Sequence, residues 1–143
     1  MLVKPNEALS ADQKAVLESM NGGIIFIVGG TGAVSEAIEE ELAAYGEVAR
    51  IAGASRYETS VAVAEIFFEN ADKALIASGR NFPDGLCGGP LAAALNAPLI
   101  LTKDGATDAA AGYVAANEIT SGYVLGGAGA LSDATVNAVF GLK

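Results

Sequence analysis

The amino-acid sequence predicts an α/β fold, a three-layer sandwich in which a mainly parallel sheet of about five strands is flanked by helices on both faces. Short blocks rich in Val, Ile and Leu alternate along the chain with segments of helical spacing. Most of these blocks are apolar without polar alternation, which is typical of parallel strands that are buried on both sides. This order of elements indicates the α/β class.

Five blocks form the predicted strands, and only the second departs from the apolar pattern. They are Ile24 to Val28, Glu47 to Ile51, Lys73 to Ala77, Pro98 to Thr102 and Gly122 to Leu125.

Serine residues mark the predicted helix starts. Ser10 with Gln13 and Ser55 with Glu58 have the spacing of a capping box, in which serine and the later side chain exchange hydrogen bonds with the backbone. Two further serines, each followed by an acid, are placed as N-caps: Ser35 and Ser132. The segment around Pro90 is expected to form two short helices or one kinked helix, because proline cannot donate the helical hydrogen bond.

Composition excludes several classes of function. The 143 residues are 52% hydrophobic and 17% charged, enough for one buried core, and no apolar block approaches the roughly 20 residues that cross a bilayer. The net charge of −9 argues against a nucleic-acid partner. With no histidine and the single cysteine Cys87, neither a disulfide framework nor a metal or cofactor is expected. Met1 to Pro5 lead into no signal-peptide pattern, so we expect export to be directed by sequence outside this chain.

An internal repeat is visible in the sequence. The segment from Val28 to Ala37 matches that from Leu125 to Ala134 position by position, so Gly29 corresponds to Gly126 at an offset of 97 residues. Upstream, residues 2–4 resemble residues 101–103. We therefore expect a single domain, residues 1–143, that holds one full repeat unit, about 24–120, and part of another. Such a repeat indicates an array, and a lone copy would need self-association.

Three arginines near strand ends form the candidate binding patch. Arg56 and Tyr57 lie on the first turn of a capped helix, and Arg80 and Asn81 follow the next predicted strand, where α/β sheets place ligand clefts. Arginine suits phosphate or carboxylate because its charged fork can bind two oxygens. Arg50 completes the patch. The alternative is structural, with Arg56 paired to an acid and Tyr57 packed along the sheet.

Two other features have both structural and functional interpretations. Asp84, after Pro83, is placed to cap a helix or, alternatively, to contact a ligand or metal. Gly29-Gly30-Thr31-Gly32 matches neither the dinucleotide-binding nor the P-loop pattern, which favours a tight strand-to-helix turn over an anion-holding one.

Four stretches in the central part of the chain carry a family resemblance. They run from Arg50 to Ser60, Ala77 to Leu86, Gly89 to Ala93 and Ala97 to Thr102. In this order they resemble the bacterial cell wall binding repeat 2 family, and with the two glycine turns the resemblance covers nearly the whole chain. The residue after Asp84 is more often alanine in that family than the Gly85 found here.

The resemblance implies tandem modules, commonly three copies packed as a three-fold assembly, on secreted Gram-positive proteins such as surface-layer proteins and autolysins. It implies a non-catalytic module that anchors such a protein at the cell wall without covalent attachment. The expected partner is an anionic wall polysaccharide or teichoic-acid-like polymer, held in a groove between copies in a homotrimer or tandem array, with no membrane partner.

Two alternatives stay open at this point. One is a small hydrolase-like α/β enzyme with Cys87 or Ser78 as nucleophile and Asp84 as its acid–base partner, against which the lack of histidine counts heavily. The other is a purely self-associating structural module.

Overall fold

The chain divides into two compact units, Met1–Ala54 and Ser55–Lys143, in a computed structural model that describes residues 1–5, 7–20 and 22–142. Both units are α/β and all their strand pairs are parallel, which confirms the predicted fold class. The expected sheet of about five strands does not form. Two strands pair in the first unit and three in the second, because the chain leaves the second strand for a helix that packs in the second unit.

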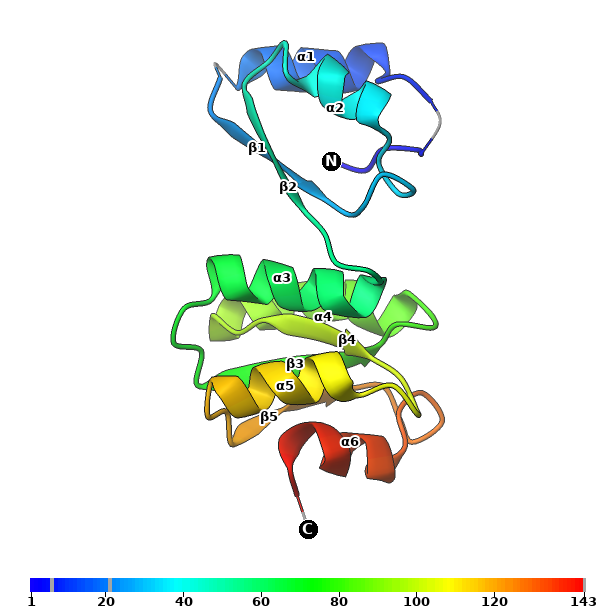
Figure 1. Ribbon diagram of the computed structural model, residues 1–143, viewed down its shortest axis with the longest axis vertical. Helices are drawn as coiled ribbons and strands as arrows, with labels where there is room; N and C mark the ends of the chain where they lie inside the picture. The colour runs from blue at the N-terminus through cyan, green and yellow to red at the C-terminus, as the bar shows by residue number, and fades with distance from the viewer. Residues whose placement is uncertain (6, 21, 143) are drawn as a thin grey trace. The chain divides into compact units, whose positions relative to one another are not determined.

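The first unit is a two-layer arrangement with helices on one face of a two-stranded sheet (Figure 1). Its elements are α1 (Ala11–Ser19), β1 (Ile24–Val28), α2 (Glu36–Leu42) and β2 (Glu47–Ile51). Ile27 of β1 packs with Leu17 of α1 and with Ile38 and Leu42 of α2 in a buried cluster. The side chains that give α2 its helical apolar spacing therefore hold it on the sheet.

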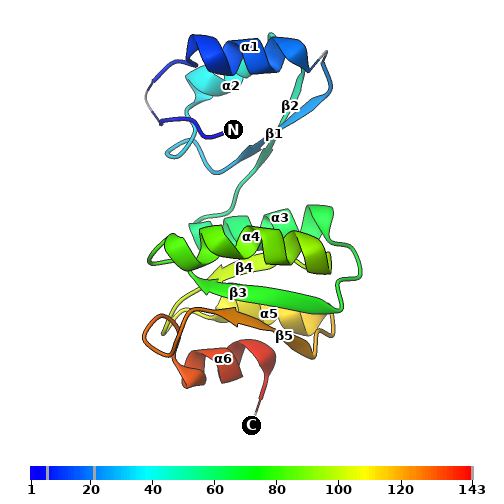
Figure 2. The same ribbon diagram turned by 180° about the vertical axis from the view of Figure 1, so that it is seen from behind.

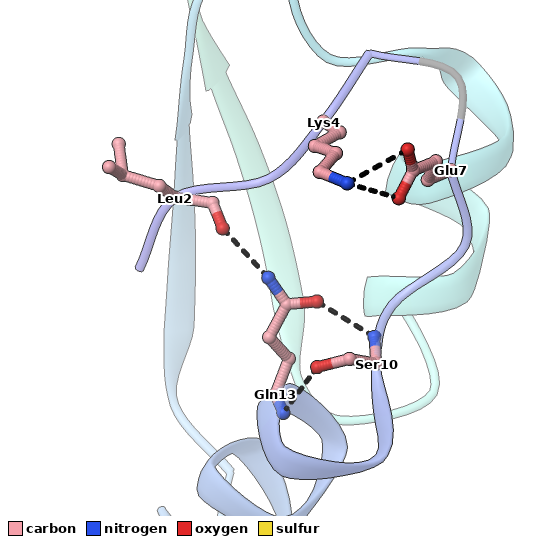
Figure 3. A network of polar contacts seen from close by, with 5 residues as sticks. All are labelled: Leu2, Lys4, Glu7, Ser10 and Gln13. Carbon is pink, nitrogen blue, oxygen red and sulfur yellow. Dashed lines mark hydrogen bonds and ion pairs between the residues drawn. The ribbon is translucent and has the colours of Figure 1, made fainter.

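Helix α1 begins with the predicted capping box (Figure 3). The Ser10 hydroxyl oxygen accepts from the Gln13 backbone N–H at 3.3 Å, and the Gln13 side-chain oxygen accepts from the Ser10 N–H at 2.8 Å. The Gln13 amide also donates to the Leu2 carbonyl at 2.7 Å, while Lys4 and Glu7 form an ion pair. One glutamine thus caps the helix and ties the N-terminal segment to it.

The second unit has three layers, with α4 on one face of a three-stranded sheet and α3 and α5 on the other (Figures 1 and 2). Its elements are α3 (Arg56–Phe67), β3 (Lys73–Ser78), α4 (Pro83–Leu95), β4 (Leu99–Thr102), α5 (Asp108–Ala116), β5 (Ser121–Leu125) and α6 (Asp133–Phe140). The strand order is β4-β3-β5, so the strand that comes first in sequence lies in the middle.

Strand β3 is the core of this unit. Residues 74–77 have no exposed surface. Ile76 packs with Ile100, Tyr113 and Val139 on the side of α5 and α6, whereas Leu75 packs with Ala92 on the side of α4. An apolar strand without polar alternation suits this position, because both of its faces are covered.

The remaining helix starts follow the sequence with two differences. Ser132 accepts from the Thr135 N–H at 3.3 Å, as predicted for an N-cap. Ser55 accepts from the Tyr57 N–H at 3.1 Å, one residue earlier than a capping box requires, and its hydroxyl donates to Glu58. Ser35 occupies the N-cap of α2, but its side chain forms no capping bond with a described residue.

Helix α4 runs unbroken from Pro83 to Leu95 with Pro90 inside it, so the alternative of two short helices is wrong. The ring of Pro90 removes the bond to the carbonyl of Leu86, a residue that is 71% exposed, where water can take the place of the missing donor. In the part of the chain that the structure describes, no helix is long and apolar enough to span a membrane.

Two neighbouring glycines of α4 allow its packing to be tested. A Cβ atom at Gly88 would lie 2.0 Å from Leu125 Cδ1, whereas a Cβ at Gly89 would meet nothing within 4 Å. We expect Gly89→Ala to raise the free energy of unfolding by about 0.5–1 kcal/mol through helix propensity. Gly88→Ala gains the same propensity but overpacks the sheet, and we expect it to be about 1–3 kcal/mol less stable than Gly89→Ala. Urea unfolding of both variants measures this difference, and equal stabilities would contradict the close packing of α4 on β5.

Candidate ligand-binding site

The carboxyl ends of the strands in the second unit gather at one end of the unit, where α3 also begins (Figure 1). The strands are parallel, so the segments that follow them lie at the same edge of the sheet. Four of the predicted site residues lie at this end of the unit: Arg80 and Asn81 follow β3, and Arg56 and Tyr57 lie on the first turn of α3.

Arg56 and Tyr57 are both held against the end of β3. Arg56 Nη1 donates to the carbonyl oxygen of Gly79 at 2.7 Å. The ring of Tyr57 occupies the space beside Gly79, where a Cβ atom would lie 2.4 Å from the ring carbon Cε1. Arg56 is exposed, and its hydrogen-bond partner is a neutral carbonyl. Its positive charge is thus presented to solvent without a carboxylate partner among the described residues.

Lys103 adds a third cation that sequence reasoning missed. Its ammonium nitrogen lies 5.4 Å from the centroid of the Tyr57 ring, within the range of a cation–π contact worth about 0.5–1 kcal/mol at an exposed site. The sequence does indicate Lys103 as a candidate site residue, because it directly follows the predicted strand that ends at Thr102. Arg80 was selected for its place after a strand, and the same criterion selects Lys103.

Asp104 was also missed, and it fixes the loop after β4 to the start of α6. Its Oδ1 accepts from the backbone N–H of Ser132 at 3.1 Å, from the Ser132 hydroxyl at 2.9 Å and from the Thr135 hydroxyl. The bond from Thr135, then those from Ser132, and lastly the charge of Arg80 hold the pKa of Asp104 below its ordinary value. Asp104 therefore orders the loop that carries Lys103.

Arg80 and Asn81 are exposed immediately after β3. The backbone N–H of Arg80 donates to the hydroxyl oxygen of Ser78 at 3.3 Å, which shapes the turn and leaves the Arg80 side chain outside it. Because Arg80 contributes to the lowered pKa of Asp104, its charge acts on the same end of the sheet. Arg56, Lys103 and Arg80 form what we call the cation cluster.

Asp84 lies on the first turn of α4, where its charge suits the positive end of the helix dipole. Its carboxylate lies against the turn after β5, since a Cβ atom at Gly126 would be 2.6 Å from Asp84 Oδ2. Gly126 has a φ of 102°, a conformation that favours glycine. Asp84 thus borders the same edge of the sheet as the cation cluster, and its contact with a ligand stays a prediction.

Arg50 lies in the first unit, where its guanidinium joins three elements. Nε and Nη2 donate to Glu39 Oε2 at 3.2 and 2.7 Å, and Nη1 donates to the carbonyl of Gly29 at 2.7 Å. Only 17% of its side chain is exposed. These bonds give Arg50 a structural role between α2 and the ends of β1 and β2, and a role in ligand binding stays a prediction.

The glycine turn after β1 has the form of a tight strand-to-helix connection. Gly29 has a φ of 128°, its N–H donates to the Ile51 carbonyl at 2.9 Å, and the Val34 N–H donates to the Gly30 carbonyl at 3.0 Å. Glycine is required at Gly29, because other residues rarely adopt this conformation. These contacts are those of a structural turn.

The first unit also contains a pocket of about 480 Å³, lined in part by Glu7, Glu41 and Ser35. Glu41 forms an ion pair with Lys14 and accepts from the Leu9 N–H at 3.0 Å, which together lower its pKa, so it carries negative charge at neutral pH. Two carboxylates at the wall of a pocket disfavour an anionic ligand. The cation cluster is the better candidate site for such a ligand.

Among the described residues, no hydrogen bond joins Asp84 to Ser78 or to Cys87, the two nucleophiles proposed for a hydrolase-like enzyme. Ser78 is only 3% exposed and its hydroxyl accepts from the Arg80 N–H. Cys87 is exposed on α4. Within the described ranges, no group of three or more Cys, Asp or Glu residues is placed to hold a metal ion.

Comparison with known families and proteins identifies similar chains. A family model described as cell wall binding domain 2 (CWB2) matches residues 50–136. N-acetylmuramoyl-L-alanine amidase LytC of Bacillus subtilis (strain 168) is 32% identical over 139 residues, 96% of this chain and 28% of that protein. The amidase enhancer of the same organism is 35% identical over 97 residues, 68% of this chain and 14% of that protein. The chain therefore spans less than a third of either relative.

Two solved structures share the fold. Cwp8 from Clostridium difficile superposes with a TM-score of 0.81 at 24% identity, over 100% of this chain and 25% of that one. Cwp6 from the same organism gives a TM-score of 0.76 at 23% identity, over 100% of this chain and 23% of that one.

The role of Asp104 can be tested by acid unfolding. Folding lowers the pKa of Asp104 from its ordinary value of 3.8. The ionised carboxylate therefore stabilises the folded chain fully when the pH is above 3.8, and this contribution is lost as the pH falls through the lowered pKa. We expect Asp104→Asn to reduce stability at pH 7 and the difference from the wild type to shrink in acid. Thermal unfolding from pH 7 to pH 3 measures it, with Asp133→Asn as a control for the loss of one exposed charge at the same helix. A difference that does not change with pH would contradict this role.

Proposed function

Because the chain belongs to the cell wall binding domain 2 (CWB2) family, we propose that this cell-wall-binding module anchors a secreted bacterial surface protein to an anionic wall glycopolymer. The attachment is non-covalent and the module itself is non-catalytic. The family match covers α3 to the start of α6, the part of the chain that carries the cation cluster. The description of the family as a cell wall binding domain supports a location of the parent protein at the cell wall.

The cation cluster is the observation that carries the proposal of an anionic ligand. In a chain with a net charge of −9, Arg56, Arg80 and Lys103 come from three separate segments and are brought to one edge of one sheet. Arg56 is bonded to a carbonyl and Lys103 lies over an aromatic ring, so neither charge is neutralised by its own partner. A polymer phosphate or carboxylate would supply the missing negative charge.

The ligand is held by charge together with the polar groups beside it. The guanidinium fork of an arginine can bind two oxygens of one phosphate, and the exposed amide of Asn81 can both donate to and accept from sugar hydroxyls. A polymer is longer than one cluster, so clusters of successive copies, tandem or homotrimeric, would line one groove. The carboxylate of Asp84, at the same edge, can accept hydrogen bonds from sugar hydroxyls of the polymer.

The amidase names among the relatives do not favour an enzyme here. The chain covers 28% of LytC and 14% of the amidase enhancer, so most of each relative lies outside the shared part. We propose that the shared part is the wall-binding one. Ser78, one of the two candidate nucleophiles, is buried at the end of β3, where a substrate cannot reach it, which supports this proposal.

Sedimentation with purified bacterial cell walls tests the cation cluster. We expect the double variant Arg56→Gln/Arg80→Gln to lose at least about a hundredfold in affinity for the walls, because two charge-assisted contacts are removed at about 1.5–3 kcal/mol each. Since Arg56 also holds the end of β3, the variant's thermal unfolding is measured in parallel.

The matched control is Lys14→Gln/Lys73→Gln. It also removes two positive charges, but neither lysine belongs to the cluster and each is paired with an acid, Lys14 with Glu41 and Lys73 with Asp72. We expect it to sediment like the wild type. Equal loss in the two double variants would show that only net charge matters, and no loss in either would remove the cluster from the binding site.

Salt provides a second test of the same site. Contacts between exposed charges are screened over about 8 Å at physiological ionic strength, and over less at higher salt. We expect the affinity of the wild type for purified walls to fall as sodium chloride is raised from 0.05 to 0.5 M (about tenfold in ionic strength). The Arg56→Gln/Arg80→Gln variant should show a shallower salt dependence. Binding of the wild type that is unaffected by salt would favour packing and sugar hydrogen bonds over charge.

A further inference from the structure

Gly79 joins the ends of three elements at the edge of the sheet where the cation cluster lies. Its N–H donates to the carbonyl oxygen of Thr102, at the end of β4, at 2.8 Å. Its carbonyl oxygen accepts from Arg56 of α3 at 2.7 Å, and the space that a Cβ atom would need holds the ring of Tyr57. Because Lys103 directly follows Thr102, this junction brings Lys103 close to Tyr57.

The backbone of Tyr57 is bonded through both its N–H and its carbonyl group. The N–H donates to the hydroxyl oxygen of Ser55 at 3.1 Å, and the carbonyl oxygen accepts from the Ser60 hydroxyl at 2.7 Å. The same Ser60 hydroxyl accepts from the N–H of Leu101 at 2.9 Å, which ties the first turns of α3 to β4. The ring of Tyr57 is therefore held beside the ends of both β3 and β4.

This ring is the partner of the Lys103 ammonium group. The ammonium nitrogen lies 5.4 Å from the ring centroid, and Lys103 forms no ion pair with another described residue. The carboxylate next to it in sequence, Asp104, accepts hydrogen bonds from Ser132 and Thr135. A lysine charge is carried on a flexible four-carbon stem, so a ring that attracts the ammonium group restricts where that charge lies.

A neutral partner differs in its effect from a carboxylate. A carboxylate would hold Lys103 and also cancel its charge, whereas an aromatic ring holds the ammonium group and leaves the charge for an anionic ligand. Arg56 is held in a similar manner by the neutral carbonyl of Gly79. Both cations are thus ordered before a ligand binds, so binding removes less side-chain freedom.

We infer that Tyr57, seated on Gly79, is the positioning residue of the cation cluster, and that its ring holds the Lys103 ammonium group for a phosphate or carboxylate of the wall polymer. The inference rests on the proposed function, which supplies the polymer. In this role Tyr57 acts through Lys103, without a contact of its own with the ligand.

Two variants separate the ring from Lys103 in different ways. Tyr57→Leu deletes the aromatic ring and keeps an apolar side chain. Gly79→Ala keeps the ring but places a Cβ atom 2.4 Å from its Cε1 atom, so the ring must move away. The φ of Gly79 lies outside the left-handed region, so alanine meets no backbone strain there, and the carbonyl that Arg56 uses is retained. Gly89→Ala is the control, because its added Cβ would meet nothing within 4 Å.

Proton nuclear magnetic resonance measures the positioning directly. Protons above an aromatic ring are shifted upfield, so we expect the ε-methylene protons of Lys103 to resonate upfield of those of the other lysines. We expect this displacement to disappear in Tyr57→Leu and in Gly79→Ala and to persist in Gly89→Ala. The conservative variant Tyr57→Phe, which has a ring, should restore what Tyr57→Leu loses. An unchanged Lys103 signal in Tyr57→Leu would overturn the inference.

Sedimentation with purified cell walls measures the consequence for binding. We expect Tyr57→Leu and Gly79→Ala to bind about two- to tenfold more weakly than the wild type, because the polymer must then order a free Lys103 side chain. In a Lys103→Gln background, Tyr57→Leu should cause no further loss. An equal loss in both backgrounds would show that Tyr57 does not act through Lys103, and the inference would be wrong.

The failure of this inference and the failure of the proposed function give different results. If the wild type does not sediment with the walls, the proposed function is wrong, and the role of Tyr57 in polymer binding is wrong with it. If the wild type sediments and Tyr57→Leu sediments equally well, the proposed function stands and the inference alone is wrong.

Discussion

The second unit depends on the burial of β3 on both of its faces. Residues 74–77 have no exposed surface, and the helices on the two sides pack against them and against the strands to either side. Because β3 is central and its neighbours run parallel to it, its carboxyl end fixes where the neighbouring strands end as well. The positions of Arg80 after β3, of Lys103 after β4, and of Arg56 beside Gly79 all follow from this burial. An acidic chain can thus present cations together at one edge of a sheet.

The fold was largely readable from the sequence because its determinants are local. Most strands are short apolar blocks, and serines at the helix starts predicted the capping pattern that α1 shows in full. Sheet membership was not readable, since it depends on pairing between distant segments. Nothing in the residues of β2 shows that, among the described residues, it pairs with β1 and not with a strand of the second unit. Helix α4 likewise continues through Pro90, because the lost hydrogen bond falls at the carbonyl of Leu86, an exposed residue.

The candidate site was predicted in part for the same reason. Arg56 and Arg80 were found because position after a strand or at a helix start is a local property. The sequence could not show that the guanidinium of Arg50 donates hydrogen bonds to Glu39 and to the carbonyl of Gly29. It also could not show that Asp104 reaches across 28 residues to Ser132, because such contacts depend on how loops meet in three dimensions. Lys103 was missed although it satisfied the criterion that selected Arg80.

The most direct test of the account is to map where a wall polymer contacts the chain. Nuclear magnetic resonance spectra of the ¹⁵N-labelled chain would be recorded during titration with the anionic glycopolymer extracted from bacterial cell walls. If the cation cluster binds the polymer, the amides and side-chain nitrogens around Arg56, Arg80 and Lys103 shift progressively, and the acidic pocket of Glu7 and Glu41 is unaffected. Shifts confined to the first unit would contradict binding at the cation cluster. The absence of any shift, with the polymer in large excess over the chain, would contradict it as well.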